Sequence, residues 1–357
     1  IIAVSQNNGV LNKNASGNID GIPYQYTTGT ASRSENHLEI LGLKIKGLLL
    51  VLWNIWKLRK ENTNTRLYLY GFSQLPNLSK FAITITANIL HIPVALELCE
   101  MPWTFGKRNN KLLSHLPVLS GISGVIAISR FLEDWSYKEA KAKKYKLKVL
   151  RIPILAELTP MNFSDTQLTE NPSVLLALSP LGNDKTLQFI LQAMQVVWTK
   201  IPNCDLILTG GMEHQQKVDQ FLENTDLDKS RVIITGYISR EELFEKYAQS
   251  WALLIPLFND FRSIARFPTK IGEYLSTARP IVTTEIGEIP YFFVDGQNAF
   301  ISQEETGYAF GKKILEALID PKRATIVGKN GYNACRDFFE YSQYSNALLD
   351  FFSELDK

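Results

Sequence analysis

The sequence offers little from which a disulfide, a membrane span or a strongly charged surface could be built. Its 357 residues include three cysteines, Cys99, Cys204 and Cys335, which are far apart and odd in number. They make neither a disulfide framework nor a zinc spacing, so a reducing compartment is the natural interpretation. The 38 lysines and arginines nearly balance the 36 aspartates and glutamates, for a net charge of +2. That balance argues against a dedicated nucleic-acid-binding protein.

Long apolar runs are missing too. The longest, residues 47–56, is interrupted by Asn54 and flanked by basic residues, whereas about 18 uninterrupted residues are needed to cross a bilayer. The first residues also lack the basic-then-apolar pattern of a signal peptide. We therefore expect a cytoplasmic protein that is either soluble or attached to the inner face of the cell membrane.

The chain begins without Met, on IIAVSQ. If residues 1–5 are the second strand of the first domain, one βα step of roughly 30 residues should precede them. Residues 7–21 are too rich in Asn and Gly to supply that helix. We therefore expect the first domain to lack its first strand and helix.

The second half alternates short apolar runs with amphipathic segments. The runs predict strands, and apolar residues at helical spacing predict the helices between them. The strands fall at residues 174–179, 205–209, 231–235, 251–257 and 280–284, and the helices at 184–200, 213–223, 240–249 and 268–277. Strands that are apolar on both faces and joined by helices make a parallel sheet covered on each side. This pattern predicts an α/β domain of the nucleotide-binding type.

The first half repeats this theme less regularly. Strands are predicted at residues 1–5, 22–26, 67–70, 93–98, 124–128 and 148–152, and helices at 37–59, 77–89 and 131–144. We divide the chain into a first Rossmann-like domain (1–155), a polar linker (156–170), a second domain (171–332) and a C-terminal helix (333–357) that could pack back on the first domain. Two such domains place a ligand-binding cleft between the carboxyl ends of their sheets.

The segment from Phe267 to Val282, FPTKIGEYLSTARPIV, carries the most chemistry. Pro268 suits the first turn of a helix, where the amides of Thr269, Lys270 and Ile271 would be free to bind an anion. Glu273 shares the helix face of Thr269 and Lys270 one turn deeper. Amides for phosphates and a carboxylate for ribose hydroxyls suit a nucleoside diphosphate. A solvated helix with a simple Lys/Glu pair is the alternative.

This segment resembles the nucleotide-binding motif of the retaining GT-B glycosyltransferases of family 4, the group 1 glycosyltransferases. Their helix is written Pro-Ser-Lys-x-x-Glu-Tyr, and here Pro268-Thr269-Lys270 is followed by Glu273-Tyr274. Other segments resemble the family in the same order and extend the likeness to about two thirds of the chain: Ser129, 147–154, 184–194, 231–257, 278–282 and 294–301.

The resemblance implies roles for particular residues. Glu273 matches the carboxylate that holds the ribose, and Lys185 matches the cation that neutralises the departing diphosphate. Fixed donors at the phosphates would stabilise the charge that develops as the sugar leaves. The remaining residues implied at the nucleotide sugar are Pro268, Thr269, Lys270, Gly210, Gly211, Gly236, Tyr237 and Ile238.

Two positions depart from the family pattern. Ala265 stands where one subgroup has a glutamate that contacts the donor sugar, and Ser179 and Pro180 stand where an arginine usually precedes the diphosphate lysine. Arg262 and Arg266 lie just before the phosphate helix and could replace that charge. An ordinary surface role for both arginines is the alternative.

The acceptor side is indicated by segments that follow strands of the first domain. Glu100 lies in ELCEMPW, where related enzymes carry a glutamate or histidine, so Glu100 joins Lys185 as a catalytic candidate; a structural role is the alternative. The loop YTTGTASR also opens toward the predicted cleft, and its Thr28, Thr30 and Arg33 are candidates for acceptor contact. His91, His115 and His214 are isolated, and we expect no metal and no cofactor beyond the donor substrate.

One stretch has the composition of a membrane-surface helix. Residues 37–60 combine many apolar residues with Trp53, Trp56 and five lysines or arginines, a combination that binds anionic bilayers. The alternative is a helix buried between the sheet and its neighbours. Residues 138–148 are also rich in lysine, which is typical of a solvated face.

These observations predict a bacterial, retaining GT-B glycosyltransferase. The resemblance implies transfer of a sugar from a nucleotide-diphosphate sugar to a glycan or lipid-linked acceptor in cell-surface polysaccharide synthesis. The two departures favour a second interpretation, a non-catalytic nucleotide-sugar-binding or scaffold subunit of a glycosyltransferase complex.

Overall fold

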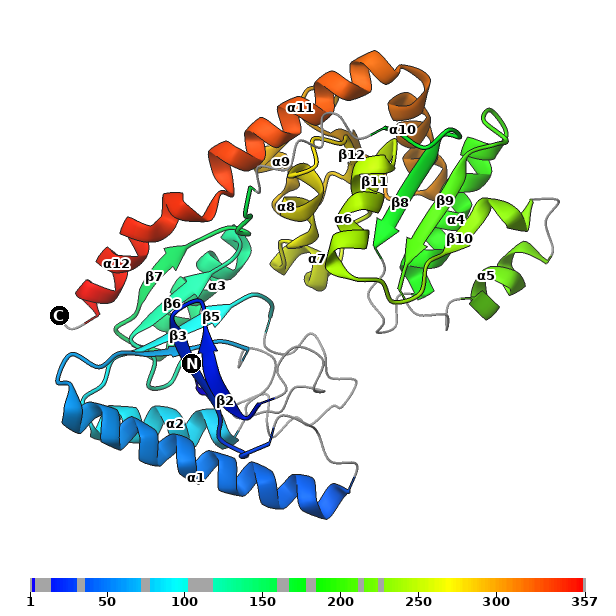
Figure 1. The fold of residues 1–357 in the computed structure, drawn as a ribbon. Coiled ribbons are helices and arrows are strands. Elements are labelled where there is room, and N and C mark those ends of the chain that lie inside the picture. The colour runs from blue at the N-terminus through cyan, green and yellow to red at the C-terminus, as the bar shows by residue number, and fades with distance from the viewer. Residues whose placement is uncertain are drawn as a thin grey trace.

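The computed structural model describes residues 2–3, 14–30, 36–71, 78–101, 118–158, 167–177, 184–210, 215–223 and 228–355. Two parallel sheets, each with helices packed on it, lie side by side along the chain, and a small third sheet lies near the N-terminus (Figure 1). The predicted α/β class is confirmed. Predicted strands and helices of the second half agree with the observed ones to within two residues at ends that fall in the described ranges.

The sheet of the second half has six parallel strands in the order β10-β9-β8-β11-β12-β13. Its strands are β8 (Ser173–Ala177), β9 (Asp205–Thr209), β10 (Val232–Ile234), β11 (Ala252–Ile255), β12 (Ile281–Thr284) and β13 (Phe300–Ser302). The helices of this half are α4 (Asp184–Trp198), α5 (Gln215–Leu222), α6 (Arg240–Gln249), α7 (Phe261–Ala265), α8 (Lys270–Leu275), α9 (Ile289–Phe292) and α10 (Gly307–Ile319).

Alternating residues of these strands feed two separate cores. In β8, Val174 and Leu176 join the core under α4 and α10, while Leu175 joins the core under α6 and α8. Because successive side chains of a strand point to opposite faces, a strand that is apolar throughout must be covered on both sides. This requirement explains why the uninterrupted apolar runs predicted the sheet so well.

The sheet of the first half has four parallel strands in chain order, β4 (Leu67–Leu69), β5 (Val94–Leu98), β6 (Gly124–Ala127) and β7 (Lys148–Arg151). Three helices accompany it: α1 (His37–Glu61), α2 (Leu78–Ile89) and α3 (Arg130–Lys143). Asn36 caps α1 and Ser129 caps α3 by accepting backbone amides of their first turns, as expected of these residue types.

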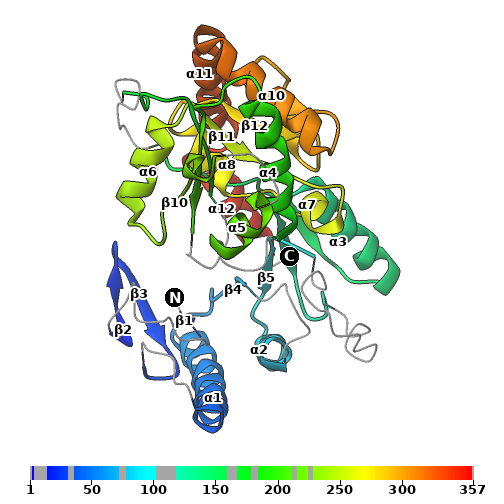
Figure 2. The same ribbon diagram turned by 90° about the vertical axis from the view of Figure 1, so that its right-hand side faces the viewer.

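The first two predicted strands do not belong to this sheet. The strand β1 (Ile2–Ala3) pairs with β3 (Ile22–Tyr26), and β2 (Ser16–Ile19) forms an antiparallel hairpin with β3. These three strands stand apart beside α1 (Figure 2). The prediction that residues 1–5 supply the second strand of the parallel sheet is therefore wrong. The tight turn at Asp20-Gly21, where both residues have positive φ, returns the chain on itself before it can cross to the larger sheet.

The predicted single helix over residues 333–357 is also wrong. The helix α11 (Pro321–Phe338) ends within this range, a 3₁₀ turn covers Tyr341–Tyr344, and a separate helix, α12 (Ser345–Glu354), follows. The interruption coincides with Phe339, which is completely buried in the core of the second half and whose carbonyl accepts the Ala156 amide (2.7 Å). The chain then crosses to the first sheet, where Phe351 of α12 packs on Ala95 and Ile126 (Figure 1).

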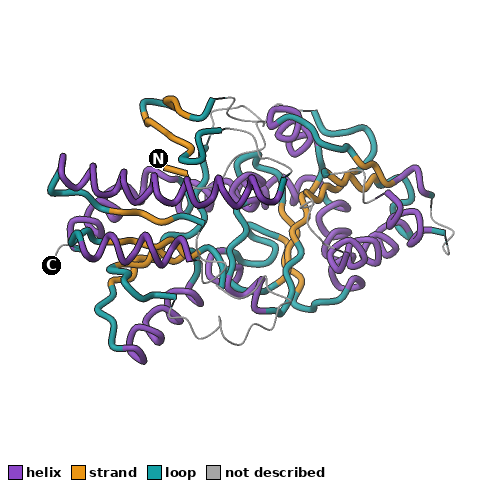
Figure 3. The backbone as a smooth tube through the Cα atoms, turned by 90° about the horizontal axis from the view of Figure 1, so that it is seen from below, coloured by secondary structure: helices purple, strands orange, loops and turns teal. Residues whose placement is uncertain are grey.

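The long helix α1 is not buried on all sides. Val51 and Ile55 face the core of the first half and Gly47 lies against the loop at Thr27, whereas Leu38, Leu49 and several other apolar side chains are exposed. The helix forms the lower edge of the molecule in Figure 1 and is seen along its length from below in Figure 3. The alternative of a fully buried helix is therefore wrong. No helix within the described ranges is long and apolar enough to span a membrane.

Candidate functional site

The strand order of the second half reverses between β8 and β11, which creates a crevice outside their carboxyl ends. The predicted donor residues follow the ends of strands of this sheet. Lys185 lies in the first turn of α4 after β8, Gly210 follows β9, Gly236 follows β10, and Glu273 lies in α8, between β11 and β12. The topology therefore brings to one edge of the sheet residues that are spread over 89 positions of the sequence.

Glu273 is held by two neighbours. The Tyr247 hydroxyl lies 3.4 Å from Oε2 of Glu273, and the Lys270 ammonium lies 3.7 Å from the same oxygen. Burial raises the pKa of Tyr247 well above its usual range, so its hydroxyl remains a hydrogen-bond donor. The carboxylate is itself about one third exposed. Its orientation is thus supported from the protein side while it stays accessible to a ligand.

The start of α8 differs from the prediction in one detail. The regular helix begins at Lys270, and the Ile271 amide donates to the Pro268 carbonyl (3.1 Å) instead of remaining free. The amides of Thr269 and Lys270 have no protein partner among the described residues. Two of the three predicted backbone donors thus remain available for an anion.

Lys185 has an acidic partner that the sequence did not reveal. Its ammonium lies 3.1 Å from Oε1 of Glu305 and 3.9 Å from the centre of the Phe258 ring. The other Glu305 oxygen accepts the backbone amide of Asn259 (2.6 Å). Lys185 and that amide therefore hold a carboxylate, an anion that a phosphate group could replace.

The two glycine turns lie against one another. Gly210 and Gly236 form an antiparallel bridge in which the Gly210 amide donates to the Gly236 carbonyl (3.3 Å). Both have positive φ, 140° and 69°, a backbone conformation that favours glycine. The neighbouring Tyr237 is 78% exposed, with Ile238 beside it half-buried. Gly211 lies outside the described residues.

The structure joins two candidates that the sequence left separate. Glu100, buried after β5, forms an ion pair with Arg266 from the second half. Arg266 therefore does not stand as a simple replacement for the missing phosphate arginine, because it already neutralises Glu100. Burial lowers the pKa of Arg266, although the adjacent carboxylate favours its charged form.

The acceptor-side loop packs on α1. Thr28 is buried, and its hydroxyl donates to the Thr30 carbonyl (3.3 Å). A Cβ on Gly47 would lie only 3.2 Å from Oγ1 of Thr27, so this glycine lets the loop approach the helix closely. The burial of Thr28 does not suit it to contact an acceptor directly. Arg33, His115 and His214 lie outside the described residues.

Besides the Glu100–Arg266 pair, two further contacts join the two halves. The Ser129 hydroxyl donates to the Ala265 carbonyl (2.7 Å). Arg130 donates to the carboxylate of Glu288 through its amide (2.7 Å) and its guanidinium (2.8 Å). The Glu288 side chain is only 3% exposed. Sequence reasoning missed Glu288, because nothing in the local pattern shows that its partner comes from the other half.

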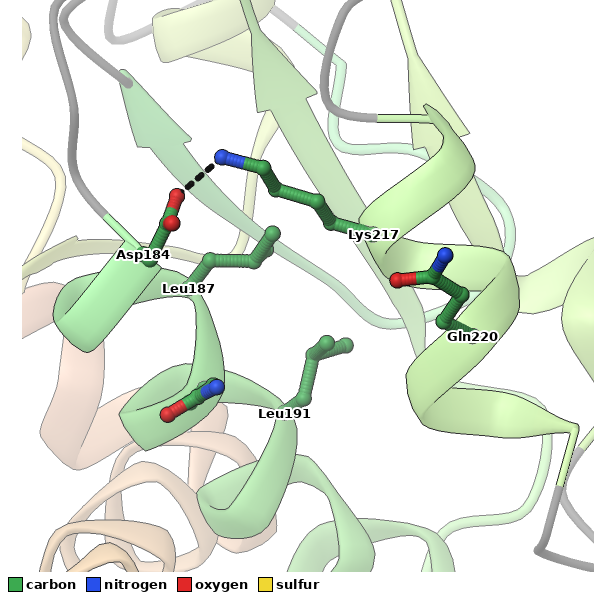
Figure 4. Close-up of a pocket in the computed structure, with 6 residues that line it drawn as sticks. Asp184, Leu187, Leu191, Lys217 and Gln220 are labelled. Atoms are coloured by element: carbon green, nitrogen blue, oxygen red, sulfur yellow. Dashed lines mark hydrogen bonds and ion pairs between the residues drawn. The ribbon is translucent and has the colours of Figure 1, made fainter.

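A cavity of about 340 Å³ lies between α4 and α5. Asp184 and Lys217 point toward one another across it and form an ion pair (Figure 4). Its lining consists of Asp184, Leu187, Gln188, Leu191, Lys217 and Gln220. None of the predicted donor residues belongs to that lining. Within the described ranges, no three His, Cys, Asp or Glu side chains are grouped as metal ligands.

Residues 172–320, which contain the reversal point and the predicted donor residues, match the family model for group 1 glycosyl transferases. The second half of the chain is therefore similar to that family. No curated protein matches the chain by sequence.

The whole chain has the GT-B architecture of two Rossmann-like domains. Its fold is similar to Anabaena HepE in complex with UDP-glucose, with a TM-score of 0.67 over 94% of this chain and 86% of that one, at 15% identity. The sucrose-phosphate synthase of Thermosynechococcus elongatus gives a TM-score of 0.67 over 98% and 87%, at 14% identity. A glycosyltransferase from Rickettsia africae gives 0.62 over 91% and 84%, also at 14% identity. At such identities the likeness establishes the fold alone.

Sequence reasoning missed two residues of the second half that contact predicted ones. Tyr247 has the appearance of an ordinary core residue in α6, and only the packing of α6 against α8 brings it to Glu273. Glu305 follows β13, which is not among the strands predicted from the sequence. Identifying the buried run Phe300–Ser302 as a strand would have placed Glu305 at the carboxyl edge with the other site residues.

Proposed function

We propose that the protein is a retaining glycosyltransferase that moves a sugar from a nucleotide-diphosphate sugar to a glycan or lipid-linked acceptor. The observation that carries this proposal is the arrangement at the reversal point: Lys185, the turn pair Gly210 and Gly236, and Glu273 follow strand ends on one edge of the sheet in the second half, which is similar to the group 1 family. The similar fold of HepE, which was solved with UDP-glucose, supports a uridine nucleotide as the first donor to test.

In this proposal each donor-site residue acts on a different part of the nucleotide sugar. The Glu273 carboxylate accepts the ribose hydroxyls, and the amides of Thr269 and Lys270 bind phosphate oxygens. Lys185 exchanges Glu305 for the diphosphate and stabilises its charge as the bond to the sugar breaks. The turn Gly236-Tyr237-Ile238 contacts the base, with the exposed Tyr237 ring available for stacking.

The acceptor approaches from the first domain in the same proposal. Glu100 is the catalytic candidate on that side, and its ion pair with Arg266 ties it to the donor domain. A cytoplasmic location on the inner face of a bacterial membrane, a role in cell-surface polysaccharide synthesis and independence from metal ions belong to the proposal as well.

The decisive experiment measures turnover. Purified protein is incubated with UDP-glucose and related nucleotide sugars, and release of the nucleoside diphosphate is followed together with binding by calorimetry. We expect binding of at least one donor and its slow hydrolysis, which an added acceptor accelerates. If none of the uridine, guanosine and adenosine donors binds, the proposal is contradicted.

A second candidate function is a non-catalytic nucleotide-sugar-binding subunit. Two observations favour it. Ala265 stands in place of the donor-sugar glutamate, and the ammonium of Lys185 is already paired with the carboxylate of Glu305. A protein that binds the donor but neither hydrolyses nor transfers it, with every acceptor tested, would support this second function.

A further inference from the structure

The outward face of α1 carries an unusually apolar surface. Leu38, Ile45, Leu49 and Trp56 follow one another at intervals of 7, 4 and 7 residues, so they share one side of the helix. Their exposed fractions are 81%, 55%, 62% and 36%. Trp53 lies beside Trp56, with ring centres 4.8 Å apart, and is 56% exposed. Together with Leu41, which is 57% exposed, these residues form what we call the α1 stripe.

The opposite side of α1 fixes the helix on the protein. Val51 and Ile55 are buried with Leu69 in the core of the first half. Arg59 donates to the Leu90 carbonyl (3.1 Å), and Asn36 caps the first turn. The α1 stripe therefore lies on a fixed helix, because the buried side holds its outward orientation.

Lysines border the α1 stripe. Lys46, Lys57 and Lys60 are exposed on the side of the stripe, whereas Lys44, seven residues before the buried Val51, lies on the other side. The helix has two acidic residues, Glu39 and Glu61. The Lys60 ammonium lies 3.9 Å from the centre of the Trp56 ring. Such a lysine can place its ammonium at lipid phosphates while its aliphatic chain lies along the apolar surface. Tryptophan next to lysine is typical of the boundary between acyl chains and headgroups.

We propose that α1 docks the protein on an anionic lipid bilayer, with the helix axis parallel to the membrane plane and the α1 stripe inserted at the headgroup boundary. A helix of 25 residues covers about 37 Å of that surface, and it is not apolar enough to span the bilayer. This deepens the proposed function, on which it rests for the lipid-linked acceptor, since α1 belongs to the acceptor-side half.

Charge favours a bilayer over a second copy of the chain. In a two-fold pairing through the α1 stripes, the exposed lysines of each copy would border the same interface, and each helix brings only two acidic residues to offset them. An anionic lipid surface neutralises the same lysines, and each lysine near such a surface favours binding about fivefold.

The test uses the full chain and sucrose-loaded vesicles, either phosphatidylcholine alone or phosphatidylcholine mixed with phosphatidylglycerol. We expect sedimentation with the mixed vesicles and little with the neutral ones. The Ile45→Glu/Leu49→Glu variant should lose binding by about tenfold or more, because two inserted side chains are replaced by charges that the lipid repels. Lys46→Gln/Lys60→Gln should weaken binding about fivefold per lysine.

A matched control is Ile319→Glu/Ile326→Glu, which changes two exposed isoleucines of α10 and α11 in the second half. It adds the same charge and should bind vesicles as wild type does. The proposal would be overturned if the wild-type protein does not bind the mixed vesicles, or if the Ile45→Glu/Leu49→Glu variant binds them as the wild type does. A dimer without lipid that this variant dissociates would identify a second copy as the occupant instead.

Measurements on the nucleotide separate this proposal from the proposed function. The Ile45→Glu/Leu49→Glu variant should retain the Kd of wild type for UDP and its hydrolysis of the donor. Vesicle binding without donor binding would refute only the transferase, and donor binding without vesicle binding would refute only the docking.

Discussion

The two parallel sheets of this protein differ in one point of topology. In the first half the strands β4, β5, β6 and β7 lie side by side in chain order, whereas the second half starts in the middle of its sheet and reverses direction between β8 and β11. Only a reversal separates the loops on either side of two adjacent strands and leaves a crevice between them. The second half therefore has the reversal point at which open α/β sheets generally bind ligands, and the first sheet has none among its described strands.

This difference in topology agrees with the positions of the candidate functional residues in each half. In the second half, Lys185, Gly236 and Glu273 lie at loops or helix starts fixed by the sheet. In the first half, Glu100 depends on Arg266 from the other half for its charge partner, and the largest exposed apolar surface is the outward face of α1. The candidate donor residues thus all belong to the second half, while the first half contributes Glu100 and the exposed face of α1.

The largest effect of a single substitution is expected at Glu273. In Glu273→Ala, a nucleoside diphosphate should bind at least 100-fold more weakly, because two hydrogen bonds to a charged group are lost at about 1.5 kcal/mol or more each. Calorimetry with UDP measures the Kd, and the melting temperature should not change. Glu245→Ala, on the exposed side of α6, is the control; equal affinity in both variants would contradict the assignment of the ribose site.

The contact between the halves should show the next largest effect. Arg130→Ala leaves the buried Glu288 carboxylate with only one backbone donor. We expect the free energy of unfolding to fall by about 2 kcal/mol, less than for a fully buried pair because Arg130 is partly exposed. Lys148→Ala breaks the exposed pair with Glu354 and should cost less than about 0.5 kcal/mol. Urea denaturation measures the free energy of unfolding of both variants. Equal losses would show that the burial of Glu288 does not strengthen its pair with Arg130.

A substitution in the first half, at Lys80, should have a smaller effect on stability and should stabilise the protein. Burial lowers the pKa of Lys80 from 10.5 to about 8. Between these two values the unfolded chain binds more protons than the folded one, so wild-type stability gains from this group as the pH rises through 8. Lys80→Met should therefore stabilise the protein by about 1 kcal/mol at pH 7, and the gain should shrink toward pH 10.

Thermal denaturation at several pH values tests the Lys80 prediction. Lys57→Met is the control, because Lys57 is exposed on α1. A stabilisation by Lys80→Met that is the same at pH 7 and pH 10 would show that its origin is packing and not the buried charge.

The smallest effect is expected at Tyr247 in the second half. Tyr247→Phe removes only the hydroxyl that lies 3.4 Å from Glu273. The Kd for UDP should rise about threefold, as expected for loss of one weak hydrogen bond, with the fold retained because the ring stays in its core. Tyr308→Phe, at an exposed position of α10, should leave the Kd unchanged.

Sequence reasoning succeeded where local pattern and local structure coincide. The apolar runs of the second half are strands because each is buried on both faces, and the motif around Glu273 is contained in a single short helix. It failed where distant segments decide the outcome. Residues 1–5 have strand composition but pair with β3, and the helix predicted over residues 333–357 is interrupted because Phe339 is drawn into the core of the second half.

The α/β class, the spacing of strands and helices, and the glycine and carboxylate positions of the second half follow from the sequence, because periodicity and short motifs depend on neighbours along the chain. Only the tertiary structure decided which charges meet. The pairs Glu100–Arg266, Arg130–Glu288 and Lys185–Glu305 join residues more than 100 positions apart. It also decided which apolar side chains of α1 are exposed, since apolar residues occur on both sides of the helix and burial depends on the sheet and helices against which it packs.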